Sequence, residues 1–150
     1  MIIGRSKNID HLQALEACVM TFKVIQTDQA PQAIGPYVQA LQGSGWTVLS
    51  GQIPLRPDGS LVQGTIEEET DQVLANLEAV LKAAGLTKEH VIKTTIFTTD
   101  LNLFGAINAR YEAFFAPHRP ARSTIGVMAL PRGARIEIEA WAYDDGTPTR

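Results

Sequence analysis

Residues 120–143 read PARSTIGVMAL, PRG and ARIEIEAWAY, and this stretch decides the expected fold. Two sets of alternating apolar residues flank its Pro-Arg-Gly centre: Ile125, Val127 and Ala129, then Ile136, Ile138 and Ala140. Alternation is typical of a strand with one buried face, and Pro-Arg-Gly is turn chemistry. The pattern therefore predicts a β-hairpin that buries both apolar sets on one face, because a one-residue slip would expose one set.

The same register predicts a polar second face that carries Arg122, Thr124, Glu137 and Glu139. A sheet with one wet face would explain these residues without any function, and an arginine near a strand end is often a solvated edge residue. A guanidinium fork also suits a small carboxylate, and a carboxylate pair suits proton transfer. Both interpretations stay open on these residues alone.

Composition limits the function classes. The 150 residues carry a net charge of −3 with 45% hydrophobic side chains, as in a single globular domain. There is no basic excess for nucleic acid and no apolar run long enough for a bilayer, so we expect neither partner and a cytoplasmic location. One cysteine, Cys18, and three histidines without ligand spacing argue against a disulfide framework or a metal site.

The residue composition changes at Met20, where a strand-like run begins. We expect residues 1–19 to be an N-terminal extension and residues 20–150 to be the functional domain; the alternative is that the extension packs into the fold. Short strands are expected at 21–27, 38–41 and 46–50, and a long one at 90–98.

Two helices are expected. The first opens with the capping box of Thr65 and Glu68 and stops at Gly85. The second is capped by Asp100 or Asn102 and ends before Pro117, with a buried stripe of Phe104, Ile107, Tyr111, Phe114 and Phe115. The order β-β-β-α-β-α-β-β predicts an α+β fold in which two helices cover one face of a mixed sheet. The other face, with Arg122 and Glu137, is expected to lack a cover from its own chain.

Five motifs resemble the reactive intermediate deaminase A (RidA, also called YjgF) family. They occur in the family's order over roughly residues 21–143: APQAIGPY (30–37), SGQIP (50–54), NARYEAFF (108–115), PARS (120–123) and RIEIEA (135–140). The resemblance implies a chorismate-mutase-like fold with six strands and two helices, and a homotrimer with clefts between subunits. It also implies hydrolysis of enamine/imine intermediates, such as 2-aminoacrylate and 2-iminobutanoate, to 2-keto acids and ammonia.

The resemblance assigns roles by motif. Arg122 would hold the substrate carboxylate, and Glu137 would orient or activate the attacking water. The pocket would be lined by Tyr37, Ser50, Gly51 and Asn108. Thr124 stands where the family often has cysteine, and its hydroxyl can still bind a water or an imine nitrogen. An α-imino acid is already electrophilic, so the reaction needs positioning and proton transfer and no cofactor or metal.

Strand arithmetic adds one expectation. In the hairpin, Glu137 lies opposite Met128, about six residues from Arg122, which is roughly 20 Å at ~3.3 Å per residue. A small imino acid cannot span that distance, so Arg122 and Glu137 are expected to meet across a subunit boundary.

Three alternatives stay open: a ribonuclease that inhibits translation, which the acidic balance disfavours; a non-catalytic trimer that binds small carboxylates; and a sibling deaminase of another imino acid.

Overall fold

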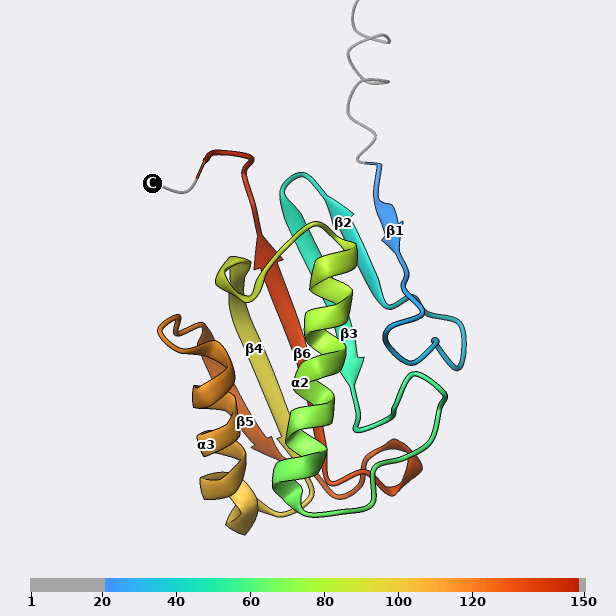
Figure 1. The fold of residues 1–150 in the computed structure, drawn as a ribbon, viewed down its shortest axis with the longest axis vertical. Helices are drawn as coiled ribbons and strands as arrows, with labels where there is room; N and C mark the ends of the chain where they lie inside the picture. Colours follow the sequence, from blue (N-terminus) through green and yellow to red (C-terminus); the bar gives the residue numbers. More distant parts are fainter. Residues whose placement is uncertain (1–20, 149–150) are drawn as a thin grey trace, which may run out of the picture.

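The computed structural model describes residues 21–148. The expected extension at 1–19, with Cys18 and His11, lies outside the described residues. Figure 1 shows the order β1, β2, β3, α2, β4, α3, β5, β6, which is the expected order. No helix of the described part is both long and apolar enough to cross a membrane.

Within residues 21–148, six strands form one mixed sheet in the order β1-β2-β3-β6-β4-β5. All neighbours pair antiparallel except β4 and β5, which run parallel. The bounds are β1 Lys23–Ile25, β2 Ala40–Gly43, β3 Trp46–Gln52, β4 Val91–Thr98, β5 Ala121–Gly126 and β6 Ile136–Tyr143.

Helix α2 (Ile66–Ala83) begins and ends where its sequence predicts. The Thr65 hydroxyl accepts from the backbone N–H of Glu68, whose carboxylate accepts from the backbone N–H of Thr65. Acidic residues occupy the first turn, where their negative charge interacts favourably with the positive end of the helix dipole. Gly85, at φ 75°, follows the helix in the left-handed conformation.

Helix α3 (Phe104–Phe115) follows a 3-10 turn at Leu101–Leu103. Asp100 caps that turn, accepting from the backbone N–H of Asn102. Ile107, Tyr111 and Phe115 are buried, as expected. Phe104 is exposed, so its assignment to the core is wrong.

The predicted hairpin between β5 and β6 is wrong. β4 lies between these strands, and β5 pairs with β4 in parallel through the α3 crossover. The residues between β5 and β6 include a 3-10 turn at Pro131–Gly133, so the expected turn is present but joins strands that are not neighbours. A parallel pair needs a long crossover, and α3 supplies it.

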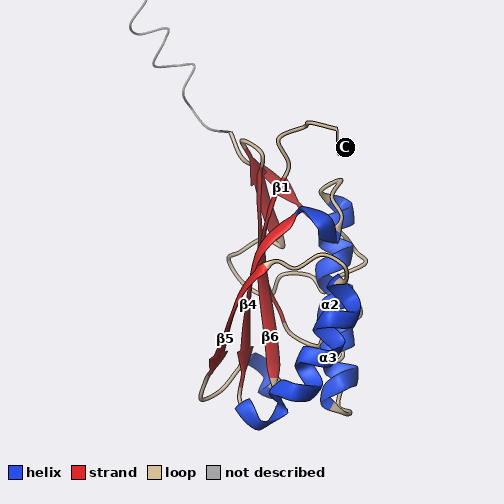
Figure 2. Ribbon diagram, turned by 90° about the vertical axis from the view of Figure 1, so that its left-hand side faces the viewer, coloured by secondary structure: helices blue, strands red, loops and turns tan. Residues whose placement is uncertain are grey.

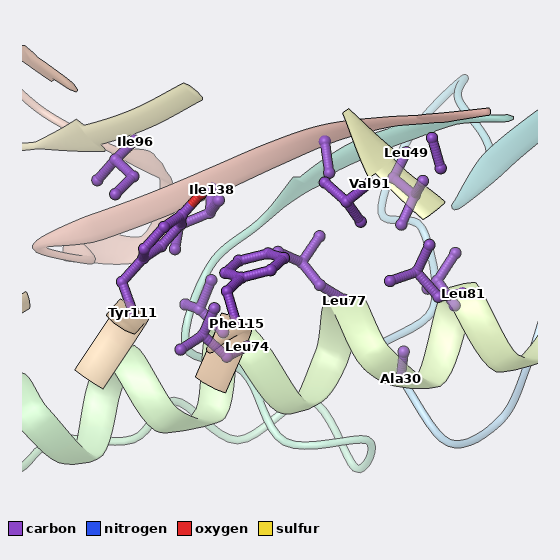
Figure 3. Close-up of a cluster of buried hydrophobic side chains, with 14 of the residues drawn as sticks. Ala30, Leu49, Leu74, Leu77, Leu81, Val91, Ile96, Tyr111, Phe115 and Ile138 are labelled. Atoms are coloured by element: carbon purple, nitrogen blue, oxygen red, sulfur yellow. The ribbon is translucent and has the colours of Figure 1, made fainter. Parts of the chain in front are cut away.

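Helices α2 and α3 lie on one side of the sheet, as Figure 2 shows, and the predicted two-layer architecture is confirmed. Ile136, Ile138 and Ala140 of β6 face the helices and are buried. They belong to one core cluster with side chains such as Leu74 and Leu77 of α2 and Phe115 of α3. Figure 3 shows Ile138 in this cluster. Ile125 is 44% exposed, contrary to expectation, because it is level with Phe97 of β4 and points to the sheet face away from the helices.

No part of residues 21–148 covers the sheet face away from the helices, and the apolar side chains on this open face are exposed. Four of them stand level across four adjacent strands: Val24, Leu41, Val48 and Trp141. Trp46 and Tyr143 extend this open-face patch, with Trp46 in ring contact with Trp141 and with Tyr143.

Candidate active site

Arg122 lies on the helix-covered face, and this overturns the expectation that it shares a face with Glu137. In the β4–β5 ladder Arg122 stands level with Thr94, a fully buried residue of the helix-covered face. Side chains level with each other in neighbouring strands point to the same face. Thr124, level with Ile96, shares that face two residues further along β5.

The Arg122 side chain is held by α3. Its Nη1 donates to Asn108 Oδ1 at 2.9 Å. Its guanidinium carbon lies 4.8 Å from the centre of the Tyr111 ring and 5.5 Å from that of Phe104. Guanidinium groups bind favourably on aromatic faces at such distances. Two rings and one amide therefore fix the group and leave most of its N–H donors for a ligand.

Tyr111 is itself anchored. Its hydroxyl and that of Thr94 are hydrogen-bonded at 2.7 Å, and its ring packs on Phe115 with centroids 4.6 Å apart. Burial raises the pKa of Tyr111, partly opposed by the Thr94 hydrogen bond and by the positive charge of Arg122. Tyr111 is thus a neutral ring held between the core and the arginine.

We name Arg122, Asn108, Thr124, Tyr111 and Phe104 the arginine half-site. A cavity of about 480 Å³ lies beside it, with Arg119 and His118 also in its wall. The ring contacts of Tyr111 and Phe104 were missed from the sequence because both residues fit the core stripe. Their spacing, at three and four residues from Asn108, places all three on one helix face and is the signal that could have found them.

Glu137 lies on the open face of the sheet, level with Phe97 of β4. It is half-buried, and no hydrogen bond from residues 21–148 reaches its carboxylate. Burial raises its pKa, and the charge of Glu139, two residues along on the same face, raises the pKa further. A carboxyl group of this kind can exchange protons nearer to neutral pH than an ordinary one.

Gly51 permits this position of Glu137. The Glu137 carboxylate rests directly against Gly51 of β3, so that any Cβ at Gly51 would overlap a carboxylate oxygen. The pairing of β3 with β6 is irregular between Leu49 and Gln52, which places Gly51 at the break in the ladder. A glycine here lets the carboxylate keep this position, and a side chain at Gly51 would displace it.

Ser50 and Tyr37 shape the loop beside Glu137. The Ser50 hydroxyl donates to the Val38 carbonyl at 2.6 Å, which ties β3 to the loop just before β2. The Tyr37 hydroxyl accepts from the backbone N–H of Ile34 at 3.2 Å, and its side chain is exposed. We name Glu137, Gly51, Ser50 and Tyr37 the carboxylate half-site.

The predicted site residues therefore divide into two groups within one chain. Arg122 and Glu137 are two strands apart and three register positions out of step, or roughly 14 Å between Cα atoms, and they point to opposite faces. The expected alignment of Glu137 with Met128 is wrong, since β5 ends at Gly126 and does not pair with β6. No group of three or more potential metal ligands occurs among residues 21–148.

The comparisons with known proteins agree with this fold. The family model described as Endoribonuclease L-PSP matches residues 27–144, and the chain belongs to this family, which is the RidA/YjgF family indicated by its motifs. The chain is 50% identical over 121 residues to the 2-iminobutanoate/2-iminopropanoate deaminase of Mus musculus, covering 80% of this chain and 90% of that protein.

Two solved structures are similar over almost their full lengths. A putative endoribonuclease of Thermotoga maritima superposes with a TM-score of 0.81 at 50% identity, covering 83% of this chain and 98% of that one. TdcF of Escherichia coli, solved with bound serine, superposes with a TM-score of 0.78 at 41% identity, covering 81% and 98%.

Proposed function

We propose that this chain is a homotrimeric imine deaminase that hydrolyses 2-iminopropanoate, the tautomer of 2-aminoacrylate, and 2-iminobutanoate. The products are 2-keto acids and ammonia. The observation that carries the proposal is the pair of half-sites: a clamped arginine with free donors, and a half-buried carboxyl group of raised pKa. The name of the Mus musculus relative supports the substrate class, and the bound serine of TdcF supports a small amino-acid-like ligand.

Assembly would complete the site. Because the two half-sites face opposite sides of one sheet, each site needs the arginine half-site of one subunit and the carboxylate half-site of its neighbour. The exposed open-face patch supports such an assembly, since proteins that act as monomers rarely expose a contiguous apolar surface of this kind. Cyclic symmetry would repeat the same contact three times.

The proposed reaction follows from the two half-sites. Arg122 binds the substrate carboxylate through paired N–H donors and orients the C=N bond. A water oxygen bonds to the imine carbon while Glu137 accepts a proton from the water and passes it to the nitrogen, which gives a carbinolamine. Glu137 then carries the hydroxyl proton to the nitrogen, the C–N bond breaks as C=O forms, and ammonia departs. Thr124 would hydrogen-bond the nitrogen or the water.

The test is a coupled assay in which an amino-acid oxidase generates the imino acid in the cuvette. Semicarbazide traps the imine, so a deaminase lowers semicarbazone formation and raises free keto acid above the spontaneous rate. We expect this effect with alanine and 2-aminobutanoate as precursors, and its loss in Arg122→Ala. Glu137→Gln should lower turnover more than it weakens binding of 2-oxobutanoate.

Other outcomes identify the alternatives. Keto-acid binding without any acceleration would make the protein a carboxylate-binding trimer. Acceleration restricted to other precursors would make it a sibling deaminase. RNA cleavage that Arg122→Ala leaves intact, with no effect on imines, would overturn the proposal in favour of the ribonuclease activity in the family's description.

A further inference from the structure

A second cavity, of about 340 Å³, opens beside the carboxylate half-site. It shares Tyr37 and Gly51 with that half-site, and apolar residues such as Ile34, Ile53 and Leu55 form much of its wall. This volume is at the lower end of the ~300–1,000 Å³ of small-molecule pockets. Because the cavity shares Gly51, which the Glu137 carboxylate contacts, it is the space into which a substrate side chain would extend.

Arg132 is the one charged side chain that lines this cavity. It is also the one arginine of residues 21–148 with no hydrogen bond or ion pair inside that part of the chain. The others have partners: Arg56 with Ser60, Arg110 with Asp71, Arg119 with Glu112, Arg122 with Asn108 and Arg135 with Glu69. The Arg132 guanidinium is therefore free to bind an anion.

The backbone at Arg132 is unusual for an arginine. Its φ of 61° and ψ of 15° lie in the left-handed region, and Gly133 follows with φ 72°. Glycine or asparagine adopts this conformation at lower energy than a long side chain does. Strained backbone beside a cavity often marks a side chain that binds a ligand there.

We infer that this cavity recognises a second acidic group on the substrate, and that Arg132 makes the enzyme favour imino acids derived from dicarboxylic amino acids. The inference rests on the proposed function and extends it to the substrate's side chain. Arg122 of one subunit would hold the α-carboxylate, and Arg132, in the cavity wall of the neighbour, would hold the distal carboxylate. The apolar wall would contact the methylene groups between them.

The occupant follows from charge and size. A guanidinium in an otherwise uncharged cavity favours an anion, and carboxylate matches its fork geometry. In the proposed site the substrate side chain would lie near Gly51, which also lines this cavity, so the anion that would reach Arg132 most directly belongs to the substrate itself. Four- and five-carbon imino diacids fit this arrangement.

The experiment compares two five-carbon imino acids generated by oxidases, one from glutamate and one from norvaline, which differ in the distal carboxylate. The quantity measured is the ratio of their kcat/KM values. In the wild-type trimer the glutamate-derived imine should be favoured, and the ratio should fall about 10-fold in Arg132→Gln and Arg132→Gly. Arg132→Gly also removes the backbone strain, so it should fold at least as well as the wild type. Lys82→Gln on α2 makes the same change in net charge and should leave the ratio unaltered.

An unchanged ratio in both Arg132 variants would overturn the inference and leave the proposed function standing. If the wild type hydrolyses no imino acid, the proposed function fails, and calorimetry then decides the inference alone. Tighter binding of 2-oxoglutarate than of 2-oxopentanoate, lost in Arg132→Gln, would support the role of Arg132. Equal binding of the two keto acids would refute it.

Discussion

Arg122 and Glu137 lie on opposite faces of one sheet: Arg122 is level with Thr94 of β4, and Glu137 is level with Phe97, three residues further along β4. Residues at odd separations on a strand point to opposite faces. Two residues that sequence motifs assign to one site are thus separated by the thickness of the sheet. A trimer can bring copies of them together, as proposed above, and a single chain cannot.

Complementation should restore activity between two inactive variants. Arg122→Ala and Glu137→Gln, unfolded and refolded together in equal amounts, form mixed trimers in which one of three sites has both residues intact. Random mixing predicts about one quarter of wild-type activity, because about three quarters of the trimers are mixed. Each variant refolded alone is the control. Hybrid trimers, verified by a tag on one variant, that remain inactive would contradict the shared site.

Replacing Arg122 with lysine should be almost as damaging as replacing it with alanine. An ammonium cannot reproduce a two-pronged carboxylate contact while donating to Asn108 and stacking on Tyr111. We expect a loss on the order of 2–5 kcal/mol in transition-state stabilisation, measured from kcat/KM. Near-normal kcat/KM in Arg122→Lys would show that the arginine only carries surface charge.

Two changes at Tyr111 should separate its two contacts. Tyr111→Phe keeps the ring under Arg122 but leaves Thr94 without its hydrogen bond, so stability should fall by about 1 kcal/mol while KM stays near that of the wild type. Tyr111→Leu removes the aromatic face, so KM should rise as well. Urea denaturation and steady-state kinetics measure the two effects. Equal KM values in both variants would mean that the ring does not position Arg122.

The pH dependence of kcat/KM should reflect the ionisation of Glu137. Its pKa is raised above the ordinary value of 4.5, first by burial and then by Glu139. Glu139→Gln removes the second cause, so the acid limb of kcat/KM should move to lower pH. Glu78→Gln on α2 makes the same change in net charge and should leave the limb in place. If the acid limb of the pH profile stays in place in both variants, the limb reflects the ionisation of another group.

The same shift has a consequence for stability. A carboxyl group whose pKa is raised on folding contributes stability that is fully present below its unfolded pKa, near 4.5, and is lost as the pH rises through the folded pKa. Glu137→Gln cannot ionise, so its stability relative to the wild type should increase with pH across that window. Denaturant midpoints measured at several pH values check the sign.

Removal of residues 1–19 should leave assembly and turnover near those of the full chain, because both half-sites and the open-face patch lie within residues 21–148. Both tryptophans of the chain belong to that patch, with Trp46 40% and Trp141 45% exposed in the single chain. Their fluorescence should therefore shift to shorter wavelength as the trimer forms, in the truncated and the full-length protein alike. A truncated protein that stays monomeric would show that the extension takes part in assembly.

Local sequence patterns determined the elements and their buried sides. Thr65 and Glu68 placed the start of α2, Gly85 its end, and the alternation of Ile136, Ile138 and Ala140 identified the buried face of β6. These signals succeed because caps and alternation depend on residues a few positions apart. The motifs also named residues that the structure brings into contact, such as Arg122 with Asn108, and Glu137 with Gly51.

Only the tertiary structure decided which strands are neighbours, and with that the face on which Arg122 lies. The turn at Pro131–Gly133 is the same in either topology, so local chemistry cannot distinguish a hairpin from a longer connection. β4, α3 and β5 instead form a parallel unit whose crossover packs on the core. Pairing of strands is selected by burial summed over the whole sheet, and that selection turned Arg122 toward α3 and left Glu137 on the open face.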